Sequence, residues 1–138
     1  MKVREAMAKT LSSAKKSDKV IDVAKKMKQE DAGFIPVVED GGVVIGVITD
    51  RDIVIRCIAE GHDPRSESAE HLMSRDVTKV DPNDDIEDAA RTMERDEIRR
   101  LPVIENGRLV GVLSHGNLVQ ATKNKTAAKV TEGVTRGA

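Results

Sequence analysis

The chain contains two copies of one sequence pattern, and this repetition limits its fold more than any other feature. Residues 33–52 (GFIPVVEDGGVVIGVITDRD) return as residues 99–117 (RRLPVIENGRLVGVLSHGN). The offset is 66 between Pro36 and Pro102 and 65 between Gly46 and Gly111, so the first copy has one extra turn residue. Duplicated units tolerate such a change at a hairpin tip. The repeat predicts one fold with an internal two-fold axis.

The size of the chain makes each copy half of a domain. A chain of 138 residues with 38% apolar residues can bury one modest core. We therefore expect a single α/β (α+β) domain. Its expected parts are a first motif at 1–62, a connector at 63–70 with Gly/Pro/Ser composition just before and within it, a second motif at 71–122 and a basic C-terminal tail at 123–138.

Within each copy the pattern predicts strand, helix, strand, hairpin, strand and helix. Apolar residues recur with helical spacing over 20–27 and 86–93, and Asp84 with Glu87 resembles a capping box at the second of these helices. Hairpin turns are indicated at 40–42 and 106–107. The strands after these turns, at 43–48 and 109–113, are almost entirely apolar, which predicts cover on both faces. Gly46 and Gly111 inside them indicate either a close approach by a backbone or ligand, or a bulge or packing contact.

Composition excludes several classes of function. The chain has no Trp or Tyr, one Phe and one cysteine, which argues against base stacking on aromatic side chains as its binding mode. The N-terminal residues lack the apolar stretch of a signal peptide, no segment is long enough to span a membrane, and we expect a cytoplasmic protein. Residues 1–28 carry nine Lys/Arg against three acidic residues; a solvated surface explains this better than a polyanion partner, so nucleic acid stays a minor alternative.

Residues that could suggest catalysis or metal binding have simpler explanations. Cys57 lies on the apolar face of an expected helix and is predicted to be a buried thiol. His62 and His71 have no known metal-ligand spacing. Ser114 and His115 are adjacent, and adjacent side chains diverge at a helix start, so no hydrolytic triad is indicated. We expect no enzymatic activity.

The candidate binding chemistry lies where the third strand of each copy meets its last helix. Thr49 and Asp52 stand there in the first copy, and Ser114 and Asn117 in the second. A hydroxyl at a helix start can cap backbone N–H groups, which also attract phosphate. A carboxylate one turn later can accept hydrogen bonds from both hydroxyls of a ribose. A single Thr-x-x-Asp is weak evidence, but two related segments at matching repeat positions predict a nucleoside phosphate site.

The repeat, both Pro-Val strands and both Gly-h-h-Thr/Ser-x-x-Asp/Asn segments resemble the paired CBS domains, named after cystathionine β-synthase. The resemblance covers about residues 3–122. It implies a tandem pair of β-α-β-β-α motifs with pseudo-two-fold symmetry, packed through their sheets. It also implies two clefts between the motifs that bind adenosine-containing ligands such as AMP, ADP, ATP or S-adenosylmethionine, and a disc-like homodimer.

Carried over by position, the resemblance assigns side chains to both clefts. Thr49 would contact phosphate and Asp52 the ribose of one cleft, with Ser114 and Asn117 in the other. Adenine would lie against aliphatic residues of the opposite motif. These are Val80, Ile98 and Pro102 for the first cleft, and Leu11, Ile35 and Pro36 for the second. Arg99 and Arg100 match a basic pair that binds phosphates in the family, and the sequence does not assign them to either cleft.

Asn117 departs from the family pattern because it replaces an aspartate. A neutral amide cannot provide charge-assisted acceptance from both ribose hydroxyls, so we expect the second cleft to bind more weakly or to bind something else, unless the arginines compensate. The expected function is a non-catalytic regulatory module that binds adenine nucleotides without a prosthetic group and signals to an effector protein in trans. The alternative is a ligand-free homodimeric interaction module.

Overall fold

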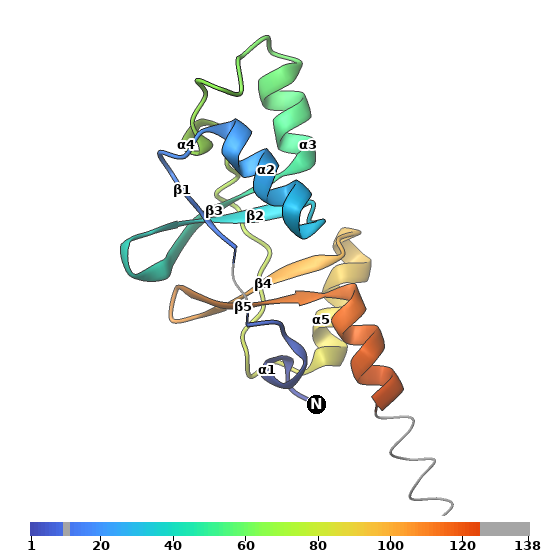
Figure 1. Cartoon of the computed structure of the whole chain (residues 1–138). Helices are drawn as coiled ribbons and strands as arrows, with labels where there is room; N and C mark the ends of the chain where they lie inside the picture. Colours follow the sequence, from blue (N-terminus) through green and yellow to red (C-terminus); the bar gives the residue numbers. More distant parts are fainter. Residues whose placement is uncertain (10–11, 125–138) are drawn as a thin grey trace, which may run out of the picture.

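Two β-hairpins with helices packed on them form the molecule (Figure 1). The computed structural model describes residues 1–9 and 12–124. The elements are α1 (Val3–Ala6), β1 (Ala14–Lys15), α2 (Val20–Glu30), β2 (Phe34–Glu39), η1 (Asp40–Gly42), β3 (Val43–Thr49), α3 (Asp50–Asp52), η2 (Ile53–Ile58), α4 (Ala69–Leu72), α5 (Ile86–Asp96), β4 (Arg100–Glu105), β5 (Arg108–Ser114) and a last helix at 115–124. This is the mixed α/β paired architecture that the repeat predicted.

The two hairpins, β2–β3 and β4–β5, lie one above the other with their tips on the same side (Figure 1). The strand order is β1-β2-β3-β5-β4, and β3 meets β5 at one residue pair, Val43 with Arg108. The backbone N–H of Val44 also donates to the carbonyl of Gly107 at 3.0 Å. Near these tips the halves are therefore joined by few backbone contacts, and side chains provide the rest.

Local predictions for the helices and turns are confirmed with three exceptions. Helices α2 and α5 bury the apolar positions expected of them, except that Ala24 is half-buried and Ala90 is exposed. The turn at 106–107 has φ of 53° at Asn106 and 80° at Gly107, as an Asn-Gly hairpin requires. The capping box at Asp84 is wrong: Asp85 is the N-cap, and the carboxylate of Asp84 accepts from the N–H of Asp81 at 2.9 Å.

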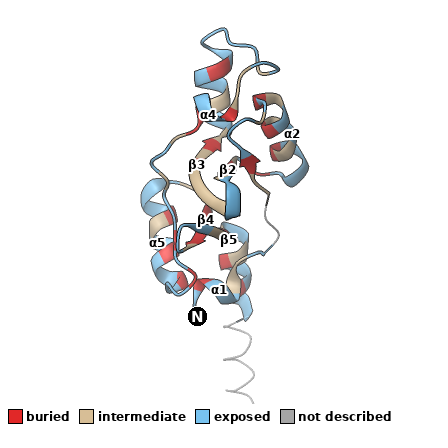
Figure 2. Cartoon of the chain, turned by 90° about the vertical axis from the view of Figure 1, so that its left-hand side faces the viewer, coloured by how far each residue is buried: buried red, intermediate tan, exposed pale blue. Residues whose placement is uncertain are grey.

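Burial of the strands also differs from the prediction. Strands β3 and β5 alternate between buried and half-buried residues only in their second parts, and their first parts bury no residue, so they are not covered on both faces. The paired strands β2 and β4 instead bury consecutive residues, such as Ile35 to Val37. The reason is that β3 and β5 leave one face open beside the hollows described below. Figure 2 shows buried positions between the sheets and helices and exposed positions on the outer helix faces.

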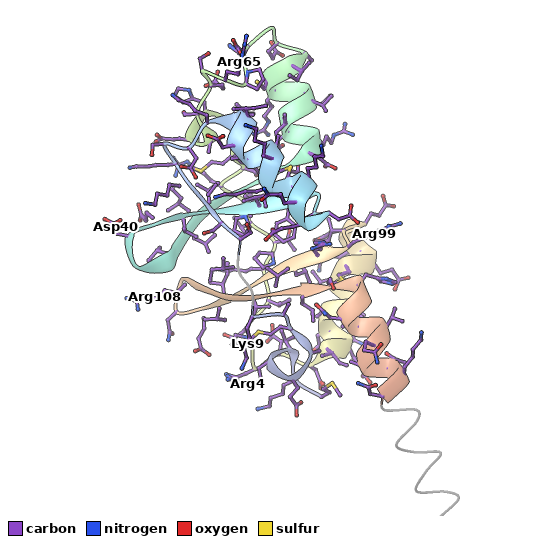
Figure 3. All side chains as sticks on the ribbon, in the orientation of Figure 1. Arg4, Lys9, Asp40, Arg65, Arg99 and Arg108 are labelled. Carbon is purple, nitrogen blue, oxygen red and sulfur yellow. The ribbon has the colours of Figure 1, made fainter. Side chains whose placement is uncertain are left out.

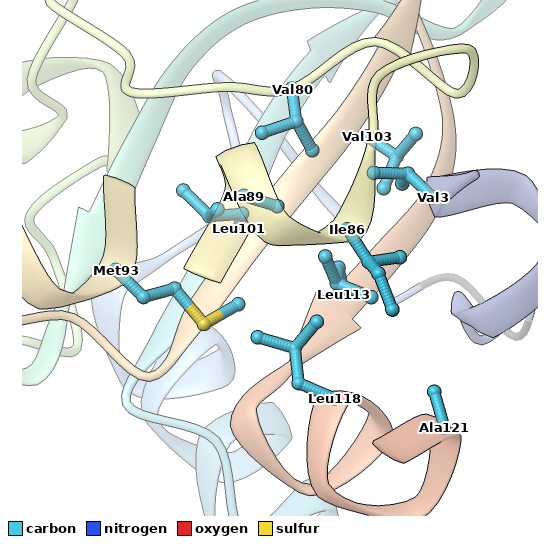
Figure 4. Close-up of a cluster of buried hydrophobic side chains, with 10 residues drawn as sticks. All are labelled: Val3, Val80, Ile86, Ala89, Met93, Leu101, Val103, Leu113, Leu118 and Ala121. Atoms are coloured by element: carbon cyan, nitrogen blue, oxygen red, sulfur yellow. The ribbon is translucent and has the colours of Figure 1, made fainter. Parts of the chain in front are cut away.

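The opening helix of each copy packs on the opposite half. Val3 of α1 is fully buried in the core cluster of the second half, among Ile86, Leu101, Val103 and neighbouring residues (Figure 4). Helix α4, which opens the second copy, packs through Ala69 and the adjacent Met73 into the core of the first half. The two copies therefore exchange their first helices, and each core contains residues from both copies of the repeat.

After each opening helix the chain crosses a strand of the other half. Ala8 pairs with Val112 through two backbone hydrogen bonds of 2.9 and 3.0 Å, and Ser74 pairs with Val47 through two of 2.9 Å. A Cβ added at Gly111 would lie 2.9 Å from the carbonyl oxygen of Ala8, and at Gly46 it would lie 2.9 Å from that of Ser74. Of the alternatives for these glycines, the close approach is by backbone, and the strand register also shifts, as at a β-bulge, directly beside each glycine.

Two further expectations concern burial and membranes. Cys57 is fully buried against Val20 and Leu72, and this burial, with Glu67 and Asp63 nearby, raises the pKa of its thiol. Within the described ranges, no helix has the length and apolar character needed to cross a bilayer.

Candidate functional site

The pseudo-two-fold axis generates two hollows between the halves. The large cleft has a volume of about 920 Å³ and the small cleft about 310 Å³, both within the range of small-molecule sites. Equivalent positions line them. In the order large cleft and then small cleft, these are Thr49 and Ser114, Asp52 and Asn117, Val47 and Val112, Ser74 and Ala8, Thr78 and Ser12, Ile98 and Ala32, Arg100 and Phe34, and Pro102 and Pro36.

Thr49 and Asp52 form a capping box at the mouth of the large cleft. The backbone N–H of Thr49 donates to Oδ2 of Asp52 at 2.9 Å, and the N–H of Asp52 donates to Oγ1 of Thr49 at 3.1 Å. The second carboxylate oxygen, Oδ1, lies 3.8 Å from Nε of Arg56. Asp52 therefore caps a helix with one oxygen and retains acceptor capacity on the other.

Ser114 and Asn117 repeat this geometry in the small cleft. The N–H of Ser114 donates to Oδ1 of Asn117 at 2.9 Å, and the N–H of Asn117 donates to Oγ of Ser114 at 3.0 Å. Oδ1 is the amide's acceptor, so the other end of the side chain is an NH₂ group, which only donates. The two clefts thus present opposite hydrogen-bonding groups at equivalent positions: a carboxylate oxygen at Asp52 and an amide NH₂ at Asn117.

Some predicted apolar contacts line the clefts and others do not. Ile98 and Pro102 line the large cleft and Pro36 lines the small cleft. Ile35 and Val80 are among the residues buried in the two cores, 1% and 6% exposed, and line neither cleft. Side chains alternate along a strand, so Ile35 points away from the face that Pro36 presents. Leu11 lies outside the described residues.

The basic pair is shared unequally between the clefts. Arg99 lines the large cleft, whereas Arg100 lines both. Figure 3 shows Arg99 at the level where the second half faces the first. Nη2 of Arg100 donates to the backbone carbonyl of Asp31, at the end of α2, at 2.9 Å. Arg100 therefore reaches from the second half to the first.

The large cleft mixes both signs of charge. Its basic lining residues are Arg51, Arg56, Arg99 and Arg100, and its acidic lining residues are Asp31, Asp50, Asp52, Asp76 and Glu97. In the small cleft the charged residues among the described lining are Glu30 and Arg100. The large cleft thus has several cations for an anionic ligand, and the small cleft has one.

Sequence reasoning missed the lining contributed by the segments that follow each opening helix. Ser74, Asp76, Val77 and Thr78 line the large cleft, while Ala8 and Ser12 line the small one. The signal was present, because residues 74–78 (SRDVT) and 8–12 (AKTLS) are related at the same offset of 66. It was weak, because the two segments share residue character rather than identity.

The pattern of the CBS domain family matches residues 3–58 and 69–124. The CBS domain-containing protein YhcV of Bacillus subtilis (strain 168) is 36% identical over 126 residues, which cover 91% of this chain and 89% of that protein. Sequence similarity therefore extends over both copies of the repeat.

Solved structures give the same result for the fold. Hypoxic Response Protein I with two coordinated zinc ions matches with a TM-score of 0.79 and 31% identity, over 87% of this chain and 98% of that one. CBSX2 in complex with AMP matches with a TM-score of 0.78 and 27% identity, over 91% and 98%. Zinc is a property of that first relative. In residues 1–9 and 12–124 of this chain, no group of three or more His, Cys, Asp or Glu residues is arranged to hold a metal ion.

Proposed function

Because the chain belongs to the CBS-domain family, we propose that it is a non-catalytic regulatory module that binds an adenosine-containing nucleotide in the large cleft and signals to a partner protein in trans. The observation that carries this proposal is the composition of that cleft. Thr49 and Asp52 come from the first half, and Ile98, Arg99 and Pro102 come from the second. AMP is bound by the similar protein CBSX2.

The ribose is assigned to Asp52. One oxygen of this carboxylate accepts from the N–H of Thr49, and the other lies 3.8 Å from Nε of Arg56, at the edge of ion-pair distance. That second oxygen can accept a charge-assisted hydrogen bond from a ribose hydroxyl, which is stronger than a neutral one. The mixed charge of the cleft therefore suits a ligand with hydroxyl donors as well as anionic groups.

The phosphates are assigned to Arg99 and Arg100, with the hydroxyl of Thr49 as a further contact. Guanidinium groups offer fixed pairs of donors that match phosphate oxygens. The adenine is assigned to the aliphatic wall formed by Ile98 and Pro102. A flat base can pack there without aromatic partners, which suits a chain with 1% aromatic residues.

Regulation follows from the position of the ligand between the halves. A nucleotide that contacts Asp52 of one half and Arg99 of the other favours the orientation in which both contacts are made. A partner protein that binds one orientation more tightly then senses the nucleotide as a coupling free energy. The effector is expected to bind in trans.

Isothermal titration with AMP, ADP and ATP tests this function. The most informative variant is Asp52→Asn, because Asn117 makes the same capping hydrogen bonds with an amide at the equivalent position of the second copy. Asp52→Asn should weaken nucleotide binding about five- to tenfold, the difference between a charged and a neutral acceptor. Asp22→Asn, on the exposed side of α2, makes the same charge change outside the cleft and serves as the matched control. Equal affinities for these two variants would refute the ribose assignment, and no binding by the wild type would refute the function.

A second candidate, the ligand-free homodimeric interaction module, is supported by exposed apolar side chains. Val54, Ile55 and Ile58 of η2 are 55%, 49% and 55% exposed, and Val119, the repeat equivalent of Val54, is 39% exposed. Large apolar side chains grouped on a surface are typical of an interaction site. Light scattering should report a dimer for the wild type and a monomer for Val54→Asp/Ile58→Asp. A dimer that binds none of the three nucleotides would favour this module over the sensor.

A further inference from the structure

The repeat supplies one pair of arginines for two clefts. Arg99 and Arg100 occupy the repeat positions of Gly33 and Phe34. The second half therefore contributes two cations to the boundary between the halves, where the first half contributes none at the equivalent positions. At these repeat positions the basic side chains available to the two clefts therefore come from the second half alone.

Arg100 is placed where it can serve either cleft. It is the first residue of β4, it pairs with Ser114 in the sheet, and it is half-buried. Both Arg100 and Ser114 line both clefts. The guanidinium donates to the carbonyl of Asp31, which is a neutral acceptor. A phosphate is a stronger acceptor than a neutral carbonyl and can displace this contact.

The two clefts depend on Arg100 to different degrees. The large cleft is also lined by Arg51, Arg56 and Arg99. Among the described residues that line the small cleft, Arg100 is the only basic one, and Glu30 opposes an anionic ligand there. An anion in the small cleft therefore requires Arg100, whereas an anion in the large cleft uses it together with other cations.

We propose that Arg100 is a phosphate ligand shared by both clefts, so that an anion in one cleft weakens nucleotide binding in the other. This inference rests on the proposed nucleotide function and adds a regulatory property to it. A guanidinium that forms a two-pronged contact with one phosphate has fewer donors for a second phosphate, and its charge is already compensated. By linkage, the weakening is the same in both directions.

The size of the effect follows from the loss of one charge-assisted hydrogen bond. Such a bond corresponds to about a tenfold change in affinity. We therefore expect an anion fixed in the small cleft to weaken AMP binding in the large cleft about tenfold. An anion can be fixed in the small cleft by substitution of Ser12, because Ser12 lines the small cleft and not the large one.

The experiment is a double-mutant cycle measured by isothermal titration with AMP. Ser12→Glu places a carboxylate in the small cleft, and Ser12→Gln places a neutral side chain of the same size there. With Arg100 present, Ser12→Glu should bind AMP about tenfold more weakly than Ser12→Gln. In the Arg100→Ala background the two should bind AMP equally, because the shared cation is gone. Circular dichroism confirms folding, and Ser12→Asp against Ser12→Asn repeats the comparison with shorter side chains.

Each outcome separates this inference from the function on which it rests. Equal affinities of Ser12→Glu and Ser12→Gln with Arg100 present would overturn the shared role of Arg100 and leave nucleotide binding intact. A tenfold difference that persists in Arg100→Ala would also overturn it, because general repulsion between anions would then explain the effect. Failure of the wild type to bind AMP, ADP or ATP would overturn both proposals.

Discussion

Replacing Gly111 with alanine should destabilise the protein through the crossing of its N-terminal segment over β5. The added Cβ would lie 2.6 Å from Sδ of Met7 and 2.9 Å from the carbonyl oxygen of Ala8. The methionine can move, but the carbonyl cannot move without disturbing the two hydrogen bonds, of 2.9 and 3.0 Å, between Ala8 and Val112. The crossing segment must therefore shift away from the strand.

The expected cost combines overpacking with weakened hydrogen bonds. Overpacking in a close-packed region costs about 1–3 kcal/mol, and each backbone hydrogen bond contributes about 0.5–1.5 kcal/mol. Partial loss of both bonds brings the expected decrease in the free energy of unfolding to about 2–4 kcal/mol. With a urea m-value of about 2 kcal/mol/M, the middle of the usual range for small proteins, the midpoint of urea unfolding should fall by roughly 1–2 M.

Urea denaturation followed by circular dichroism measures this change. Gly116→Ala is the matched control, because the nearest atom to its added Cβ, Oγ of Ser114, is at an ordinary contact distance of 3.6 Å. Alanine is preferred to glycine in a helix, so this control should be as stable as the wild type or slightly more stable. A Gly111→Ala variant within about 0.5 kcal/mol of the wild type, the usual range for surface changes, would refute the reasoning. So would full rescue by Met7→Ala, since that change leaves the carbonyl contact in place.

Three further predictions concern individual side chains. Asn117→Asp should raise nucleotide affinity in the small cleft about five- to tenfold by adding a charged acceptor; unchanged titrations would contradict it. The hydrogen bond from His71, at 2.6 Å from Oε1, is the main cause that lowers the pKa of Glu67. The ionised Glu67 carboxylate therefore stabilises the fold above the ordinary pKa of a glutamate, and this stabilisation is lost as pH falls through the lowered pKa. Glu67→Gln should be less stable than the wild type at pH 7 and equally stable in acid, and unfolding curves at the two pH values check this. Burial raises the pKa of the Cys57 thiol, so a thiol reagent at pH 8 should modify it much more slowly in buffer than in urea; equal rates would be inconsistent with a buried thiol.

Most of the fold was predictable because each local sequence pattern occurs twice, at equivalent positions of the two copies. The helical spacing at Val20 is ambiguous alone, but its equivalent at Ile86 has the same spacing, and both helices form. The Asn106-Gly107 turn was predictable because few residues accept positive φ. The capping box was not, since Asp84 instead accepts from the N–H of Asp81, and a local sequence motif does not reveal which of several nearby N–H groups a carboxylate will accept from.

The candidate site was predictable where function depends on residue type and less so where it depends on side-chain direction. Thr49 and Asp52 line the large cleft, as the pattern at the helix start indicated. Ile35 lies in the core because a shift of one residue along a strand changes the face to which a side chain points. The exchange of the opening helices depends on contacts between residues more than sixty positions apart, such as that between Val3 and Asp84, and no local pattern encodes them.

The exchanged helices also determine what a single copy of this repeat could do alone. A fragment that carried only the second copy would keep α4, but Ala69 of this helix and the adjacent Met73 belong to the absent core. The same fragment would lack Val3, which completes its own core. Such a fragment would expose apolar surface on one side and have an unfilled space on the other. Two identical fragments could remove both defects by exchanging helices with each other, so a symmetric pair of short chains can satisfy the same packing as the covalent tandem.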